Sequence, residues 1–145
     1  MLGGAILVTP AVGPSAIVVC MAHYEKLLAW KECHTLALKV YRATETFPSQ
    51  ERYGLTAQAR RAAFSAAANI AEGSTKRGPA EFRRFLDIAL GSISELEYAL
   101  RLAKDLGLAS AEVLADLESQ QHRAGFLTWR LYQAISKRAR PSVGS

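Results

Sequence analysis

Apolar residues recur every three or four positions in four segments between residues 24 and 138, and none of these segments alternates with a period of two. This spacing gathers the apolar side chains on one side of an α-helix. The predicted helices cover residues 24–46, 56–72, 79–106 and 111–138. Because the links between these long helices are short, successive helices should run antiparallel. The sequence therefore predicts an all-α fold, an antiparallel up-and-down four-helix bundle.

The predicted helix ends rest on residues that commonly start or stop helices. A serine, threonine or proline suits the first residues of a helix, and a glycine or proline just beyond the last residues stops it. The expected starts are Thr56 and Ser110 as N-caps and Pro79 at the first helical position. The expected stops are Pro48, Gly73 and Gly107.

Each helix carries an apolar stripe that should face the bundle core. In the first helix this stripe is expected to contain Leu27, Trp30, Cys33, His34, Ala37, Val40, Tyr41 and Thr44. In the fourth helix it is expected to contain Val113, Leu117, Ala124, Leu127, Leu131 and Ile135. Since His34 lies within the first stripe, we interpret it as a core histidine with a hydrogen-bond partner and not as a catalytic base.

The second helix is apolar almost all round between Ala62 and Ala71. A helix of this kind is usually buried on more than one side, and in a small bundle the additional cover would come from another subunit. The fourth helix also presents two large aromatic residues away from its core stripe, which suggests a protein contact. The sequence thus predicts a homo-oligomer whose interface includes Phe64, Ala67, Ala71, Phe126 and Trp129.

The chain of 145 residues is half apolar and about a fifth charged, which suits one globular domain. Its net charge of +5 allows an acidic partner such as nucleic acid. The candidate phosphate contacts are Arg60, Arg61, Lys76, Arg77, Arg83 and Arg84. The last four flank the link between the second and third helices and should lie at one end of the bundle, with Arg60 and Arg61 toward the other. The alternative is a solvated rim with salt bridges between subunits.

Residues 1–20 contain no charged side chain. A secretory signal would need a basic start, and the prolines in this stretch disfavour a membrane helix. We therefore expect a disordered or spurious extension at residues 1–20, a bundle domain at residues 21–138 and a disordered tail at residues 139–145. The two isolated cysteines, Cys20 and Cys33, fit a reducing cytoplasm better than a disulfide scaffold, and no membrane partner is expected.

Four polar residues are expected near the bundle interior or a helix end: Ser65, Asn69, Glu72 and Ser92. Because buried polar groups must be hydrogen bonded, an interhelix network that fixes register explains them, with a ligand site as the alternative. Glu97 is expected to pair with Arg101, one turn later. The sequence has no Glu-x-x-His pair, zinc-ligand spacing, phosphate-binding loop or nucleophile motif. We therefore expect no metal, no cofactor and no catalytic residue.

Three stretches in a fixed order carry a family resemblance: LLAWKECHTLALKVYRATETFP, then YGLTAQARRAAFSAAANIAEG, then EFRRFLDIALGSISELEYAL. They resemble the bacterial four-helix-bundle family encoded in 23S ribosomal RNA intervening sequences, over residues 24–138. The resemblance implies a ring-like homopentamer with no established enzymatic activity. It also implies a relation to the accessory protein of diversity-generating retroelements, which partners a reverse transcriptase and nucleic acid. Ala66 and Ala67 depart from the bulky apolar residue and proline more usual in the family.

Two functional hypotheses follow from these features. The first is a cytoplasmic, non-enzymatic homo-oligomer, a pentamer by the resemblance, that binds RNA, DNA or a nucleic-acid enzyme through its basic residues. The alternative is a structural or protein-interaction scaffold without nucleic-acid binding. An enzyme that acts on a small substrate in the centre of a ring is the least favoured reading. Binding to nucleic acid that weakens as salt rises would distinguish the first hypothesis from the alternative.

Overall fold

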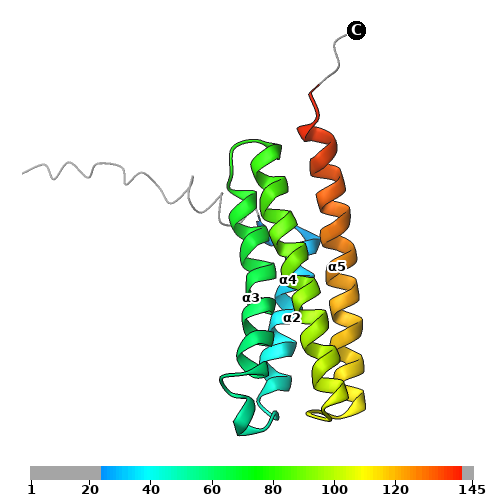
Figure 1. The fold of residues 1–145 in the computed structure, drawn as a ribbon. Helices are drawn as coiled ribbons and strands as arrows, with labels where there is room; N and C mark the ends of the chain where they lie inside the picture. The colour runs from blue at the N-terminus through cyan, green and yellow to red at the C-terminus, as the bar shows by residue number, and fades with distance from the viewer. Residues whose placement is uncertain (1–23, 142–145) are drawn as a thin grey trace, which may run out of the picture.

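In a computed structural model of the protein, the described residues are 24–141, and within them four long helices lie side by side (Figure 1). They are α2 (Leu28–Thr44), α3 (Leu55–Ser74), α4 (Pro79–Asp105) and α5 (Ala111–Ala139), with a short 3-10 turn η1 (Ser49–Glu51) between the first two. The predicted all-α four-helix bundle is confirmed. The predicted extension at residues 1–20 and most of the predicted tail lie outside the described residues.

The four helices form a square in which each contacts two neighbours. Helix α3 packs on α4, α4 on α5, and α2 closes the square by packing on both α3 and α5. The α3–α4 link and the end of α5 lie at one end of the bundle, and the other two links lie at the opposite end (Figure 1). Helix α2, with 17 residues, is much shorter than α5, with 29. No helix in residues 24–141 is long and apolar enough to cross a bilayer.

Most of the expected helix ends agree with the structure. Pro79 begins α4, and Gly107 stops it with a φ of 66°, a left-handed conformation that favours glycine. The Ser110 hydroxyl accepts a hydrogen bond from the backbone N–H of Val113, as an N-cap does. The expected N-cap Thr56 is wrong, because this residue is buried inside α3. Glu51 takes over the capping role, since its carboxylate accepts from the N–H of Leu55 at 3.0 Å.

Gly73 is also placed differently from the expectation. It is a buried residue inside α3 and does not stop the helix. A Cβ atom at this position would lie 2.6 Å from Cβ of Phe85 and 2.9 Å from the ring of Phe82, both on α4. The glycine is therefore required by the close approach of α3 and α4 and not by a helix stop.

The core face of α2 is rotated from the expected stripe. Its buried residues are Ala29, Cys33, Leu36, Val40 and Thr44. His34 and Tyr41 were expected in the core, and this expectation is wrong, because both are exposed and His34 stacks on Trp30. The apolar surface of α2 is wider than the part the bundle buries, so periodicity alone could not locate its centre. A smaller shift occurs in α5, where Leu114 is buried and Val113 is 39% exposed.

Candidate functional site

Three of the four expected network residues lie together between α3 and α4. The hydroxyl groups of Ser65 and Ser92 are 2.8 Å apart, and the Asn69 side-chain amide donates to the Ser65 hydroxyl at 3.0 Å. Ser92 also donates to the backbone carbonyl of Ile88. Glu72 does not join them, because it lies at the surface with its carboxylate 3.7 Å from the Lys76 ammonium group. The polar groups of this cluster bond to one another, which leaves the interhelix role as its best interpretation.

Cys33 is the buried thiol of the described chain. Its Sγ atom lies 3.5 Å from the Thr128 hydroxyl, which itself donates to the carbonyl of Ala124. Burial raises the pKa of Cys33 to about 11, against the opposing effect of the hydrogen bond with Thr128. The thiol is therefore protonated near neutral pH, and a protonated thiol is a poor nucleophile. Within residues 24–141, no group of three or more His, Cys, Asp or Glu side chains is arranged to hold a metal ion.

Glu32 ties α2 to α5 through two charged or polar contacts. Gln120 donates to the Glu32 carboxylate, and the Arg123 guanidinium lies 2.9 Å from its other oxygen. Partial burial acts to raise the pKa of Glu32, but the hydrogen bonds from Gln120 and Arg123 and the nearby positive charges outweigh it, so the pKa is lowered. This arrangement is a structural link that favours the ionised carboxylate.

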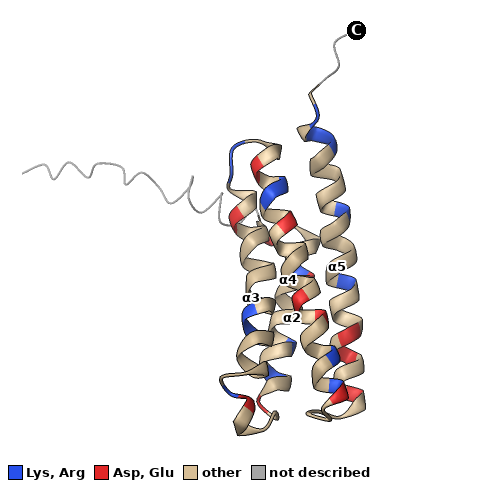
Figure 2. Cartoon of the chain, viewed as in Figure 1, with Lys and Arg blue, Asp and Glu red and all other residues tan. Residues whose placement is uncertain are grey.

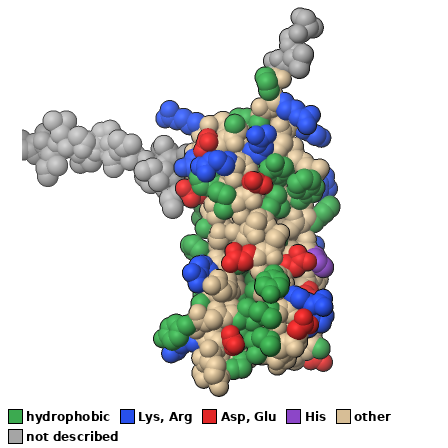
Figure 3. All heavy atoms as spheres, in the orientation of Figure 1, with side chains coloured by type: hydrophobic (Ala, Val, Ile, Leu, Met, Phe, Trp, Pro, Cys, Tyr) green, Lys and Arg blue, Asp and Glu red, His purple; other side chains and the backbone are tan. Residues whose placement is uncertain are grey.

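Seven basic side chains gather at one end of the bundle, around the α3–α4 link, the start of α4 and the end of α5 (Figures 2 and 3). We call this region the basic end, and its members are Lys76, Arg77, Arg83, Arg84, Lys137, Arg138 and Arg140. The first four were expected together from the sequence. The last three were missed, although the antiparallel order of the helices necessarily brings the end of α5 beside the α3–α4 link.

The basic end has many more positive than negative side chains. Three acidic residues lie there, Glu72, Glu81 and Asp87, which leaves a local charge of about +4 out of the chain's +5. Only two of the acids take a basic partner, Glu72 with Lys76 at 3.7 Å and Glu81 with Arg84 at 3.4 Å. Five basic residues have no acidic group within 4.0 Å in the described part of the chain: Arg77, Arg83, Lys137, Arg138 and Arg140.

The opposite half of the bundle uses most of its positive charges internally. Lys39 pairs with Asp116, Lys104 with Glu118, and Arg101 with Asp105 and not with the expected Glu97. Arg60 donates to the Thr44 hydroxyl at 2.8 Å and to the Tyr41 carbonyl at 3.3 Å, and its guanidinium covers the Tyr41 ring. Arg60 therefore fastens α3 to α2. Arg61 lies exposed beside it, far from the basic end.

Two adjoining cavities lie at the basic end, between the first turns of α4 and the last turns of α5. The first, of about 340 Å³, is lined by Arg83, Trp129, Tyr132, Ser136, Lys137 and Arg140, among others. The second shares Arg83 and Tyr132 with the first and adds Arg84 and Asp87. The rings of Trp129 and Tyr132 are stacked, with centroids 5.4 Å apart and planes 15° apart. The basic end thus combines unpaired positive charge with an aromatic surface.

An apolar groove of about 410 Å³ runs between α2 and α3. It is lined by Trp30, His34, Ala37, Leu38, Tyr41, Phe64, Ala67 and Ala68. Phe64, one of the expected interface residues, is 63% exposed at its edge, and Ala67 lies in its floor. Two other expected interface residues, Phe126 and Trp129, are exposed on α5, which does not line the groove. The structure therefore separates the expected interface into two surfaces, with Ala71 half-buried on α3.

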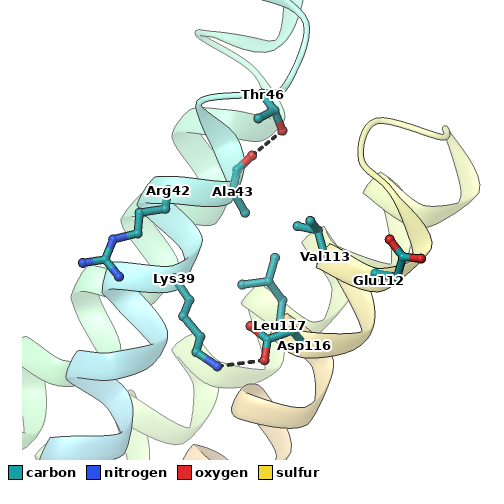
Figure 4. Close-up of a pocket in the computed structure, with 8 residues that line it drawn as sticks. All are labelled: Lys39, Arg42, Ala43, Thr46, Glu112, Val113, Asp116 and Leu117. Atoms are coloured by element: carbon teal, nitrogen blue, oxygen red, sulfur yellow. Dashed lines mark hydrogen bonds and ion pairs between the residues drawn. The ribbon is translucent and has the colours of Figure 1, made fainter.

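A further cavity lies between α2 and α5, at the end of the bundle opposite the basic end (Figure 4). The Lys39 ammonium group and the Asp116 carboxylate meet across it at 2.9 Å, and Thr46 donates to the carbonyl of Ala43 on one side. The four charged residues that line it are two basic (Lys39, Arg42) and two acidic (Glu112, Asp116), so the cavity has no net charge. This cavity consequently offers less to a charged ligand than the basic end does.

Comparison with known proteins agrees with the fold. The model of a family described as "23S rRNA-intervening sequence protein" matches residues 25–127. A 1.70 Å crystal structure of a protein of unknown function from the S23 ribosomal protein family of Bacteroides thetaiotaomicron has a TM-score of 0.66 with this chain at 21% sequence identity. The match covers 73% of this chain and 99% of that one. Among curated proteins no relative matches the sequence.

Proposed function

The chain belongs to the 23S rRNA-intervening sequence protein family, and we propose that it is a self-associating, non-enzymatic bundle that binds nucleic acid through phosphate contacts at its basic end. The observation that carries this proposal is the group of five basic side chains without an acidic partner at one end of the described structure. Phosphate oxygens are the partners that such arginine and lysine side chains favour.

Self-association is supported by the apolar groove between α2 and α3. Phe64, Leu38 and Tyr41 expose large apolar side chains along it, and groups of this kind usually mark a protein contact. A second copy of the chain covers the groove in this proposal, and a pentamer is the form implied by the family resemblance. In a symmetric ring the basic end is repeated in every subunit. The unpaired positive charges of each copy then add up to a dense positive surface.

A scaffold that binds only proteins is the second candidate function. The same apolar groove favours it, because a groove that accepts another copy of the chain can equally accept a helix of a different protein. In that case the basic end contributes to solubility alone, and the bundle has no affinity for RNA or DNA.

The test of nucleic-acid binding is the salt dependence of affinity for single-stranded RNA and DNA. Each phosphate contact should contribute about −0.7 to the slope of log affinity against log salt concentration. A basic-end variant replaces four exposed, unpaired residues with alanine: Arg77, Arg83, Lys137 and Arg138. A matched control removes four exposed, unpaired charges elsewhere: Lys31, Arg42, Arg52 and Arg61.

The basic-end variant should flatten the salt slope by about two to three, while the control variant should change it by less than one. Equal effects of the two variants would show that only net charge matters and would refute the assignment to the basic end. If the unmodified protein binds neither RNA nor DNA at low salt, the proposal fails and the scaffold function replaces it.

The test of self-association is the molar mass in solution by light scattering. Phe64→Glu places a charge on the exposed edge of the groove without disturbing the bundle core. It should convert an oligomer into smaller species, because a buried unpaired charge is costly at an interface. Tyr98→Glu, at an exposed aromatic residue of α4 that does not line the groove, is the matched control and should leave the mass unchanged. A stable monomer of the unmodified chain at micromolar concentration would refute self-association.

A further inference from the structure

The cavity of about 340 Å³ at the basic end is lined by three kinds of group: positive charges, a hydroxyl group and a pair of aromatic rings. It lies between α4 and α5, and three of the five unpaired basic residues line it: Arg83, Lys137 and Arg140. Arg83 lies in the first turns of α4, whereas Lys137 and Arg140 lie at or just beyond the end of α5, so residues far apart in the sequence line one concave space. Three positive side chains around a cavity of this size select for an anion.

Ser136 supplies a second and independent feature. It lines the cavity, and its hydroxyl oxygen is buried without a hydrogen-bond partner in the described structure. Other hydroxyl groups inside these helices are satisfied: Ser92 and Thr128 each donate to the carbonyl four residues earlier, at 3.1 and 2.7 Å. A buried hydroxyl without a partner destabilises a protein. Its position beside three positive charges suits a ligand that carries hydrogen-bond acceptors.

The stacked pair of Trp129 and Tyr132 forms the third feature. Both residues line the cavity, and one face of the Trp129 ring is covered by Tyr132 at a centroid distance of 5.4 Å. Trp129 is still 47% exposed, although large apolar side chains are usually buried. An exposed indole ring next to an anion site is the arrangement on which nucleic-acid bases stack.

We propose that this cavity is a nucleotide-binding pocket, in which Arg83, Lys137 and Arg140 hold the phosphate, Ser136 donates its hydroxyl to a phosphate oxygen, and Trp129 stacks on the base. The proposal rests on the proposed function and gives it a defined contact point: one phosphate and its base enter the pocket, and the remaining basic residues hold the neighbouring phosphates. The pocket recognises the phosphate and the flat face of a base, so it does not require a particular base.

Asp87 provides a test of whether the pocket binds a negatively charged ligand. Its carboxylate lines the adjoining cavity together with Arg83, and it has no ion-pair partner within 4.0 Å in residues 24–141. Its negative charge opposes a phosphate in the pocket. Asp87→Asn should therefore raise the affinity for a phosphate ligand, whereas a variant that merely damages the fold would lower it.

The experiment uses the full chain carrying Trp30→Phe, which leaves Trp129 as the single tryptophan. Three probes are titrated while tryptophan fluorescence is followed: adenosine monophosphate, adenosine and inorganic phosphate. Adenosine monophosphate should quench Trp129 and bind at least about tenfold more tightly than either fragment, because only it engages both the cations and the indole. Inorganic phosphate should compete with it without quenching.

Variants in the same background assign the contacts. Ser136→Ala and Arg83→Ala should each weaken adenosine monophosphate binding by about tenfold, and Asp87→Asn should strengthen it. Arg77→Ala is the matched control, since Arg77 is an unpaired cation of the basic end that does not line the cavity. It should leave adenosine monophosphate binding unchanged. Circular dichroism of each variant verifies that the helices are intact.

The results can refute the nucleotide pocket and the proposed nucleic-acid binding independently of each other. If single-stranded nucleic acid binds but adenosine monophosphate does not quench Trp129, the pocket is refuted and binding at the basic end stands. If Ser136→Ala and Arg77→Ala behave alike toward adenosine monophosphate, the pocket is likewise refuted. If adenosine monophosphate quenches Trp129 as expected but no oligonucleotide binds, the pocket stands and the proposed function falls.

Discussion

The close approach of α3 and α4 at Gly73 makes Gly73→Ala a sharp test of how the bundle is packed. The added methyl group would lie 2.6 Å from Cβ of Phe85, well inside the distance at which two carbon atoms repel. Rotation of the Phe85 side chain cannot remove this contact, because its Cβ atom moves only with the backbone. Phe82 could turn its ring away, but α3 and α4 must still separate to relieve the contact with Phe85.

The magnitude follows from two opposing effects of the same substitution. Alanine in place of glycine inside a helix stabilises by about 1 kcal/mol. Overpacking a well-packed contact costs about 1–3 kcal/mol, and more where the backbone has to move. The contact at Gly73 is with a backbone-fixed atom, so we expect the upper part of this range and a net loss of about 1–2 kcal/mol. Gly91 is the matched control, because it is exposed inside α4 and an added Cβ has no neighbour within 4 Å.

The assay is urea unfolding followed by circular dichroism, with every variant measured at the same protein concentration so that their free energies of unfolding can be compared directly. Gly91→Ala should raise the free energy of unfolding by about 0.5–1 kcal/mol, and Gly73→Ala should lower it by about 1–2 kcal/mol. For a chain of this size the corresponding shifts in melting temperature are about 3–5 °C per kcal/mol. If both alanine variants stabilise the protein to a similar extent, the tight contact between α3 and α4 is refuted.

Two further predictions concern titratable groups. In a Cys20→Ala variant, Cys33 should react with a thiol reagent only at the rate at which the bundle opens, because it is buried and its pKa is about 11; rapid labelling at neutral pH would contradict this. The lowered pKa of Glu32 means that its ionised form stabilises the fold above the usual value of 4.5, and that this contribution disappears as pH falls through the lower folded-state value. Glu32→Gln should therefore narrow the difference in urea midpoint between pH 7 and pH 3, and an unchanged difference would assign the acid sensitivity to other groups.

The sequence predicted a helix boundary correctly where the residue at that boundary acts only on its own part of the chain. Pro79, Gly107 and Ser110 act through their own backbone or side chain, so their positions in the sequence are sufficient. Gly73 has two possible roles that look identical in the sequence. Glycine suits both a helix stop and a close contact between helices, and only the position of Phe85 on α4 decides between them.

The centre of the α2 core face was not predictable because α2 has more apolar surface than the bundle buries. Trp30, His34 and Tyr41 lie on the side toward α3 and form the groove, while Leu36 is fully buried. The excess apolar surface of α2 therefore hid which of its sides faces the core of the bundle. Part of the basic end was predictable, because its residues around the α3–α4 link are close together in the sequence. Lys137 and Arg140 could be placed beside them only once the fold was known.

The position of the two proposed surfaces allows self-association and nucleic-acid binding to occur together. The apolar groove belongs to α2 and α3, the pocket belongs to α4 and α5, and α2 and α4 are not neighbours in the square of helices. Covering the groove with another subunit consequently leaves the pocket open. Phe64→Glu should thus leave binding of adenosine monophosphate unchanged while it lowers the affinity for a long single strand, which can engage several subunits of an oligomer, by about a hundredfold. Loss of adenosine monophosphate binding in this variant would show instead that the pocket needs the assembled form, and that the two surfaces are coupled.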